Sequence, residues 1–346
     1  MRFSIVVPAH NGERYLRETL ASALAQTRAP DEILLVDDAS TDGTAAIARS
    51  PQFENRVRYV YNPVATGFVD AWNRAVAYAD GDYISILHQD DLLAPDYLRQ
   101  VEASLQRYPR VEHIYAACNY IDQSGRITRT PVASAIEPVL YAGKLYAHNY
   151  LKGVLQNRHI HRCPGVTTSR SLLQSRCSYR KEAGHIADDD FFLRVGAFTD
   201  VIGIAAPLAS FREHQGSATA KVDLLALRLA QDYLFQSRYQ LENTTLLEAE
   251  DVAGIHRQTV RFINLLLFQA LRAGKGDWIA KAGDLRAELD ALVPGRTDEC
   301  LPAWAKMMWK LSQQPHTRLR LASAYVNTIS AAISLRDRMK HLRAMP

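Results

Sequence analysis

Two stretches decide the fold, Phe3-Ser-Ile-Val-Val-Pro-Ala-His-Asn11 and Leu35-Val-Asp-Asp-Ala-Ser-Thr-Asp-Gly-Thr44. Each begins with aliphatic residues and ends in polar ones, which is typical of a strand buried in a parallel sheet. Residues 13–26, between them, carry apolar side chains at helical spacing. Further strands are predicted at residues 57–61 and 83–87. The alternation of strands and helices predicts an α/β domain with a mostly parallel sheet flanked by helices.

The later part of the chain has a different character. Strand-like runs at residues 111–120 and 201–205 and a helix predicted to open at Phe191 continue the mixed pattern. Helical periodicity alone follows, in residues 223–241, 248–272, 277–292 and 318–342. We therefore predict a first domain over residues 1–217 and a helical C-terminal domain over residues 218–346.

Composition and charge narrow the class of protein. The chain has 346 residues, 47% hydrophobic and 23% charged, which excludes disordered and collagen-like classes. The net charge is +4, but residues 301–346 hold eight Lys or Arg and one Asp. We expect this basic C-terminal region either to contact anionic lipid or to form a packed helix with a solvated basic face. The first domain lacks basic patches interleaved with aromatic residues, so no nucleic-acid partner is expected.

Cysteine usage and hydropathy predict a location. The four cysteines include no CxxC pair, which favours a reducing compartment. The first ten residues hold a single basic residue and a short apolar run, unlike a signal peptide. No uncharged apolar stretch reaches the length of about 18 residues that spans a bilayer. We expect a cytoplasmic protein, with peripheral contact at the inner face of the membrane as an option.

Acidic residues follow several of the predicted strands. Residues 8–11, Asp37-Asp38 and Asp90-Asp91 stand at strand ends, which in a parallel sheet converge on one crevice. Two pairs of carboxylates so close together would repel each other without a cation. This arrangement suits a divalent metal that carries a diphosphate. The alternative is that Asp37 and Asp38 are turn and cap residues of the following Ser-Thr-Asp-Gly.

These stretches resemble the nucleotide-binding half of the family 2 glycosyltransferases, which have the GT-A, Rossmann-like fold. Asn73, Gly81-Asp-Tyr-Ile84 and Leu87-His-Gln-Asp-Asp91 continue the resemblance. Ala187-Asp-Asp-Asp-Phe-Phe-Leu-Arg194 and Arg212-Glu-His-Gln-Gly-Ser217 resemble the catalytic and C-terminal motifs of the same domain. The resemblance covers residues 1–217. It implies an inverting enzyme that uses a nucleoside diphosphate sugar.

The resemblance also implies roles for single residues. The nucleotide would be bound by Pro8, Ala9, Asn11, Asp38, Asn73 and Asp90. A divalent cation, Mn²⁺ or Mg²⁺, would be held by Asp91 with His214 nearby, and Asp188 would be the catalytic base. Two departures are visible: His88 replaces the first acid of the metal motif, and Ala187 replaces the usual Glu before the base. Asp189 is the rival base, whereas Asp190 matches a structural acid.

The expected activity is transfer of a sugar from a UDP- or dTDP-linked donor to a glycan or lipid-linked saccharide, in surface polysaccharide synthesis. The substitutions at His88 and Ala187 keep a non-catalytic nucleotide-sugar binder or scaffold as the alternative, and a homo-oligomer is open. A nucleotidyltransferase would need basic residues in the loop after the first strand, which residues 8–13 lack. The segment His159-Ile-His161-Arg-Cys163 is interpreted either as three metal ligands on one strand face or as a polar edge beside the acceptor.

Overall fold

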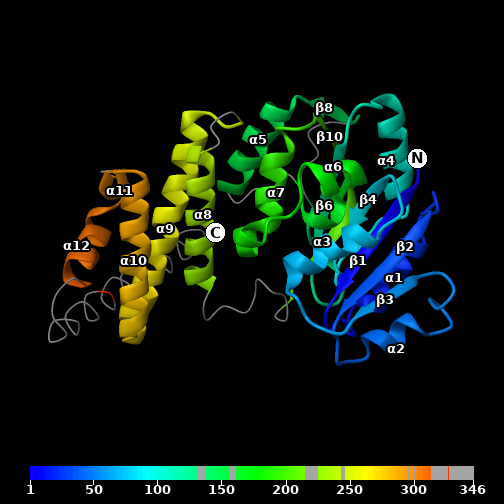
Figure 1. The fold of residues 1–346 in the computed structure, drawn as a ribbon, viewed down its shortest axis with the longest axis horizontal. Helices are drawn as coiled ribbons and strands as arrows, with labels where there is room; N and C mark the ends of the chain where they lie inside the picture. Colours follow the sequence, from blue (N-terminus) through cyan, green and yellow to red (C-terminus); the bar gives the residue numbers. More distant parts are fainter. Residues whose placement is uncertain are drawn as a thin grey trace, which may run out of the picture. The chain divides into compact units, whose positions relative to one another are not determined.

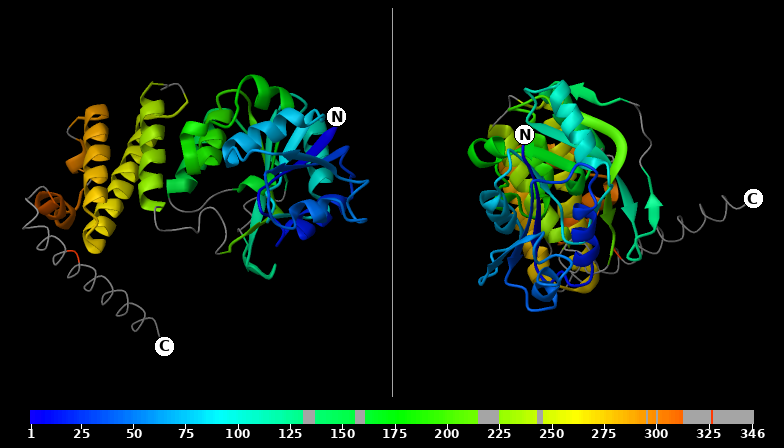
Figure 2. Two further views of the ribbon diagram at one scale, coloured as in Figure 1. Left: turned by 60° about the horizontal axis from the view of Figure 1, so that its bottom comes forward. Right: turned by 90° about the vertical axis from the view of Figure 1, so that its right-hand side faces the viewer.

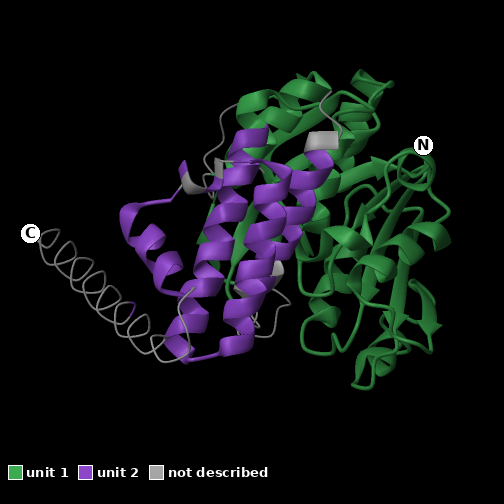
Figure 3. Ribbon diagram, turned by 60° about the vertical axis from the view of Figure 1, so that its left-hand side comes forward, with its two compact units in different colours: residues 1–221, 244–251 green, residues 222–243, 252–346 purple. Residues whose placement is uncertain are grey.

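A computed structural model describes residues 1–130, 137–155, 161–214, 225–242, 246–294, 296–299, 301–312 and 326. The chain divides into two compact units (Figure 3), Met1–Lys221 with Thr244–Asp251 and Val222–Asn243 with Val252–Pro346. The domain boundary predicted after residue 217 lies outside the described residues.

The first unit is built on a parallel half-sheet (Figure 1) with the strand order β3-β2-β1-β4. Its strands are β1 (Phe3–Ala9), β2 (Glu32–Asp38), β3 (Arg58–Asn62) and β4 (Tyr83–Ile86), joined by the helices α1 (Leu16–Leu24), α2 (Thr44–Ala48) and α3 (Phe68–Tyr78). The four strands and helix α1 were predicted, with ends shifted by a few residues. The whole of β1 is buried, which explains its unbroken aliphatic sequence.

The second half of the sheet is mixed. The antiparallel strand β9 (Val166–Ser169) joins β4 to β6 (His113–Ile121), which runs parallel to β10 (Val201–Arg212). Shorter strands are β5 (Leu92–Leu93), β7 (Ile127–Arg129) and β8 (Val139–Tyr141). The helices are α4 (Tyr97–Arg107), α5 (Gly143–Leu155), α6 (Arg170–Ser175) and α7 (Ala187–Val195), with 3₁₀ turns η1 (Cys163–Gly165) and η2 (Lys181–Ile186). The α/β class with helices around one sheet is confirmed.

Two close backbone approaches depend on glycine. A Cβ on Gly81 would come within 2.6 Å of the Ser4 backbone nitrogen, so only glycine lets this turn lie against β1. Gly143, which opens α5, and Gly196, which follows α7, lie so close that a Cβ on either would overlap the other's backbone. The second contact fixes α5 beside α7, the helix that carries Asp188.

The second unit is helical. It contains α8 (Leu225–Glu242), α9 (Ala249–Ala273) after its first turn, α10 (Gly276–Leu292), α11 (Arg296–Glu299) and α12 (Ala303–Ser312). Helices α8, α9 and α10 lie side by side in both Figure 1 and Figure 2. Leu234 on α8, Leu267 on α9 and Met308 on α12 belong to one hydrophobic core. No helix in the described part of the chain is long and apolar enough to cross a membrane. The basic helix predicted over residues 318–342 lies outside the described residues, apart from Val326.

Candidate active site

The loops after β1 and β2 are fastened to each other. Asn11 and Ala39 have positive φ angles, 52° and 61°, which side chains other than glycine rarely adopt. The Asn11 amide donates to Ser40 Oγ at 2.9 Å, and Asn11 Oδ1 accepts from the Thr41 amide at 2.8 Å. Pro8 and Ala9 lie just before this loop, buried on β1. Strained backbone of this kind persists where the surrounding structure holds it, and it clusters at functional sites.

Asp37 and Asp38 have different surroundings. Asp37 is fully buried and accepts from the Tyr59 hydroxyl at 2.7 Å and from the Ser40 amide at 2.8 Å. Burial, together with this carboxylate, raises the pKa of Tyr59. Asp37 is therefore a structural turn residue, which was the alternative interpretation of the pair.

Asp38 instead organises the chain after β3. Its carboxylate accepts from Asn62 Nδ2 at 2.5 Å and from the Thr66 amide at 2.8 Å, and it lies 3.5 Å from Arg74 Nη1. Its carbonyl oxygen accepts a 2.7 Å hydrogen bond at the His10 ring, if the ring proton is on Nδ1. Asp38 thus connects the end of β1 with the segment that leads into α3.

Asn73 is placed differently from the other predicted nucleotide ligands. Its side chain donates to the Tyr179 carbonyl at 2.7 Å and accepts from the Tyr179 amide at 3.1 Å. Both ends of the amide are therefore bonded to the backbone of one residue, and Asn73 joins α3 to the segment before η2.

Asp91 is the most unusual carboxylate of the chain. It is 1% exposed, and one oxygen, Oδ1, accepts from the Arg212 amide at 2.8 Å. The other, Oδ2, has no hydrogen-bond partner among the described residues, with His88 Nδ1 at 3.8 Å. Burial, and then the neighbouring charge of Asp90, raise the pKa of Asp91 well above its usual value. A buried carboxylate in this condition is costly unless a cation or proton meets it.

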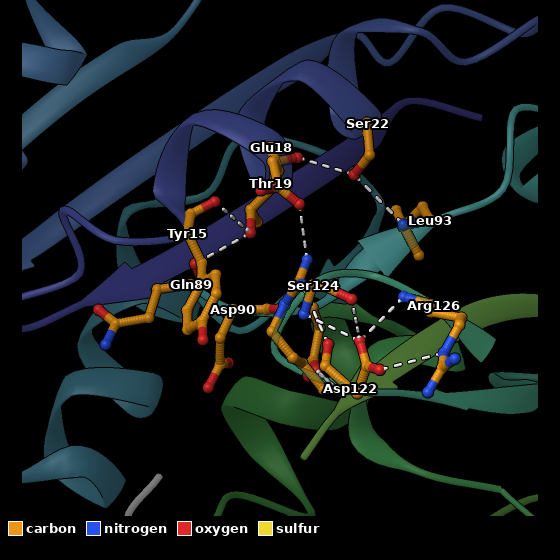
Figure 4. Close-up of polar contacts among 12 residues, drawn as sticks. Tyr15, Glu18, Thr19, Ser22, Gln89, Asp90, Leu93, Asp122, Ser124 and Arg126 are labelled. Carbon is orange, nitrogen blue, oxygen red and sulfur yellow. Dashed lines mark hydrogen bonds and ion pairs between the residues drawn. The ribbon is translucent and has the colours of Figure 1, made fainter. Parts of the chain in front are cut away.

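The loop that carries Asp90 and Asp91 is held from several sides. Thr19 donates to the Gln89 carbonyl at 2.9 Å, next to Asp90 (Figure 4). Arg212 Nε donates to the Asp90 carbonyl at 2.8 Å. The rest of the Arg212 guanidinium bonds to Glu18 at 2.8 Å and to the Asp122 carbonyl at 3.3 Å. Arg212 is a structural residue, because every part of its guanidinium has a partner within the protein.

His214 lies next to this loop. Its Nε2 is 2.9 Å from Asp90 Oδ2, and its ring packs edge-on against Tyr15 at 4.9 Å. The structure thus brings His214 next to the Asp90-Asp91 pair, although more than a hundred residues separate it from them in the chain.

The surroundings of Asp91 decide how a divalent cation could bind. Asp91 Oδ2 is a buried oxygen that a cation or a proton would satisfy, and Asp90 and His214 stand beside it. Within the described residues no group of three or more His, Cys, Asp or Glu is arranged to hold a metal ion. A cation at Asp91 would therefore rest on one or two carboxylates and take its other ligands from water and phosphate, as Mg²⁺ and Mn²⁺ do.

Helix α7 separates three consecutive aspartates into different roles. The helix was predicted to open at Phe191, but it begins at Ala187, because acidic residues stabilise a helix in its first turn. Asp190 is fully buried and pairs with Arg180 and Arg194, which is a structural arrangement. Asp189 accepts from the buried Tyr150 hydroxyl at 2.5 Å.

Asp188 has the electrostatics of a proton acceptor near neutral pH. Burial raises the pKa of Asp188 to about 7, the charge of Asp189 adds to the rise, and the Asp189 amide and Arg162 oppose it. A carboxylate with such a pKa is partly ionised at neutral pH and accepts a proton more readily than an ordinary aspartate.

Short contacts connect the separate groups. The His10 amide donates to Gln89 Oε1 at 2.8 Å, and this links the loop next to Asp38 with the loop of Asp90. Turn η1 lies at the carboxyl end of β4 and beside the middle of β6, since β9, which follows it, is antiparallel to both and pairs with β6 only as far as Tyr115. Burial raises the pKa of Cys163 in η1, and the charges of Asp188 and Asp91 raise it further. The two aspartates therefore lie within electrostatic reach of the same turn.

Residues 4–166 match the family described as Glycosyl transferase family 2. The first unit of the chain belongs to glycosyltransferase family 2. Two relatives are the putative glycosyltransferase EpsE of Bacillus subtilis, 29% identical over 42% of this chain, and the putative teichuronic acid biosynthesis glycosyltransferase TuaG of the same organism, 34% identical over 30%. The matches span 54% and 42% of these relatives, about half of their length.

A solved structure shows the same fold. It is S. aureus TarS in complex with UDP-GlcNAc, which is 16% identical to this chain, with a TM-score of 0.66 over 96% of this chain and 92% of that one. The likeness confirms the predicted GT-A fold.

Sequence reasoning missed several residues of the site. Nothing in the sequence marks Tyr150, which lies on an apolar helix, as a partner of Asp189. His161, interpreted as a metal ligand or as part of a polar edge, is a buried ring that stacks on Tyr115 and lies 2.8 Å from the Tyr146 hydroxyl. His159 lies outside the described residues.

Proposed function

We propose that this chain transfers a sugar from a nucleoside diphosphate donor to a hydroxyl group, with inversion at the anomeric carbon. The observation that carries the proposal is the buried, unpartnered oxygen of Asp91 beside Asp90 and His214, with Asp188 near the same turn η1. A cation would satisfy this oxygen, and the leaving diphosphate needs one.

The nucleotide site comprises the loops after β1, β2 and β4. Pro8, Ala9 and Asn11 line the base, Asp38 fixes the base-binding segment, and Asp90 lies toward the ribose. Asn73 acts indirectly, because its amide is bonded to Tyr179. The rigid connection between Asn11 and residues 40–41 supports a preformed site for the nucleoside.

Asp91, with Asp90 and His214 beside it, would hold Mn²⁺ or Mg²⁺ against the diphosphate. When bound, the cation neutralises the charge that develops on the leaving group. Asp91 is suited to this role because the Arg212 backbone N–H donates a hydrogen bond to its Oδ1. This hydrogen bond fixes the orientation of the free oxygen, Oδ2.

Asp188 is the proposed base. The acceptor oxygen attacks the anomeric carbon as the bond to the diphosphate oxygen breaks, and the acceptor proton passes to a carboxylate oxygen of Asp188. The pKa of about 7 supports Asp188 in this role. Asp189 is less suited, because the Tyr150 hydroxyl already donates to it.

The donor and acceptor are proposed from chemistry and from the relatives. TarS was solved with UDP-GlcNAc, and TuaG is named for teichuronic acid biosynthesis. We infer a UDP- or dTDP-linked donor, and a glycan or lipid-linked acceptor of a surface polysaccharide. The location that we propose is the cytoplasm, with the basic C-terminal region at the inner face of the membrane.

The test is release of nucleoside diphosphate from a panel of donor sugars, measured with Mn²⁺ or Mg²⁺ and with a chelator. The proposal expects release from one class of donor and its loss on chelation. Nucleotide-sugar binding without release, across acceptors that include glycans and lipid-linked saccharides, would favour the non-catalytic alternative that His88 and Ala187 suggest.

A further inference from the structure

The segment before η1 separates two sides of the site. Arg162 has an extended backbone, with φ −129° and ψ 169°, so the side chains of residues 161 and 162 point in opposite directions. His161 packs against Tyr150 at 4.9 Å and against Phe192 at 4.6 Å, on the side of Asp189. Arg162 instead lies against the rings of Tyr120 and Phe211, on β6 and β10.

Phe211 connects Arg162 to the metal-binding aspartate. It directly precedes Arg212, whose amide donates to Asp91. Arg162 therefore lies beside the strand whose end holds Asp91 through the Arg212 amide. Its positive charge also opposes the rise that burial causes in the pKa of Asp188 on α7, so this carboxylate is within its field.

The guanidinium of Arg162 is positioned by one edge only. Its Nε donates to the Tyr120 hydroxyl at 2.9 Å, and its carbon lies 5.6 Å and 5.3 Å from the Tyr120 and Phe211 ring centres. In the described part of the chain, no residue accepts a hydrogen bond from its two terminal nitrogens. A planar guanidinium held in this way presents two donors at a spacing that matches an oxyanion.

The other arginines nearby are already engaged. Arg212 bonds to Glu18 and to two carbonyl groups, and Arg180 and Arg194 both pair with Asp190. A diphosphate that enters beside Asp90 and Asp91 brings negative charge into an acidic site, and a cation at Asp91 meets it from one side. Arg162, whose two terminal nitrogens have no acceptor in the described part of the chain, can meet it from another.

We propose that Arg162 binds the diphosphate of the donor and stabilises the negative charge that it gains as the bond to the sugar breaks. The inference rests on the proposed function, since it needs a nucleoside diphosphate at this site. It assigns the contact to a residue outside the motifs that identify the family.

The test compares Arg162→Gln with Arg129→Gln. Arg129 is a matched control, because its guanidinium also lies over the Tyr120 ring, at 3.6 Å from the centre, but its side chain is 54% exposed and faces Glu213. Calorimetry with Mn²⁺ would use UDP, uridine and inorganic pyrophosphate as probes. We expect Arg162→Gln to weaken UDP and pyrophosphate binding by about 10- to 100-fold and to spare uridine. Arg129→Gln should leave all three unchanged.

Other outcomes would overturn the inference. Equal weakening of UDP and uridine would mean that Arg162 only supports packing. Unchanged UDP binding with selective loss of UDP-glucuronate over UDP-glucose would assign Arg162 to a sugar carboxylate instead. If Arg162→Gln melts below the assay temperature, Arg162→Lys replaces it and should give a smaller loss, confined to UDP and pyrophosphate. Wild-type protein that binds none of the three probes would overturn the proposed function and this inference together, whereas binding unaffected by either variant would overturn the inference alone.

Discussion

The Arg212 amide donates a 2.8 Å hydrogen bond to one oxygen of Asp91 and leaves the other oxygen of this buried side chain without a partner among the described residues. The strand that ends in Arg212 thereby holds Asp91 in a fixed orientation. The free oxygen has lost water without gaining a hydrogen bond, which costs stability in the protein without metal. This relationship gives opposite predictions for stability and for binding.

Asp91→Asn should stabilise the metal-free protein and remove metal-dependent binding. Folding raises the pKa of Asp91 above its usual 3.8, so the wild type loses stability as pH rises from about 4 through that higher pKa. An amide carries no charge and still accepts from the Arg212 amide. We expect the free energy of unfolding at pH 7, measured by urea denaturation with chelator, to rise by about 1 kcal/mol. The increase in stability that UDP with Mn²⁺ gives the wild type should vanish in this variant. If Asp91→Asn were instead less stable than the wild type without metal, the Asp91 carboxylate would already have a partner in the wild type.

Asp188→Asn should abolish transfer and leave UDP affinity nearly unchanged. Loss of a general base lowers kcat by about 10²- to 10⁴-fold. The base works only when ionised, so with a pKa of about 7 in the free protein the wild-type kcat/KM should reach half of its plateau near that pH and level off above it. Asp189→Asn is the matched variant and should keep measurable activity. Because it removes the charge that raises the pKa of Asp188, the midpoint of the pH–activity curve should move to lower pH. Full activity in Asp188→Asn would move the base to Asp189.

The parallel half of the sheet was predictable because its information is local. Strands β1, β2 and β4 are short aliphatic runs, and the polar residues that follow them stand at the ligand-binding edge by topology alone. The roles inside Asp188-Asp189-Asp190 were less accessible. They depend on Tyr150 and Arg180, which no periodicity connects to α7.

Arg162 shows the limit of motif reasoning most clearly. The position of Arg162 depends on the antiparallel pairing of β9 with both β4 and β6, which places η1 at the carboxyl end of β4 and beside β6. In the sequence Arg162 stands between His161 and Cys163. The alternation of His159, His161 and Cys163 suggested metal ligands and gave no role to Arg162. Pairing of distant strands, rather than local spacing, decides where this side chain lies.

Asp190→Asn should unfold the domain without a specific effect on nucleotide binding. The carboxylate is fully buried between Arg180 and Arg194, and its loss leaves two guanidinium groups without their counter-charge. Breaking a buried ion pair costs about 3–5 kcal/mol, which urea denaturation would measure. The control is Asp70→Asn, which removes a solvent-exposed pair with Lys181 and should cost less than about 1 kcal/mol. Equal losses for both variants would contradict the structural role of Asp190.

Asp38→Ala tests the nucleoside end of the site. The carboxylate accepts from Asn62 and Thr66 and faces Arg74, so its removal frees the segment that joins β3 to α3. Because this segment belongs to the base-binding side, uridine and UDP should weaken by the same factor, about tenfold, in calorimetry.

Two control variants distinguish a role of Asp38 in base binding from a structural role and from diphosphate binding. Asp37→Asn should lower the melting temperature and spare both ligands, because Asp37 bonds only to Tyr59 and Ser40 in the described structure. Arg162→Gln should separate UDP from uridine, whereas Asp38→Ala should not. If Asp38→Ala weakened UDP and spared uridine, Asp38 would act through the diphosphate, and the base would have to be bound by residues other than this loop.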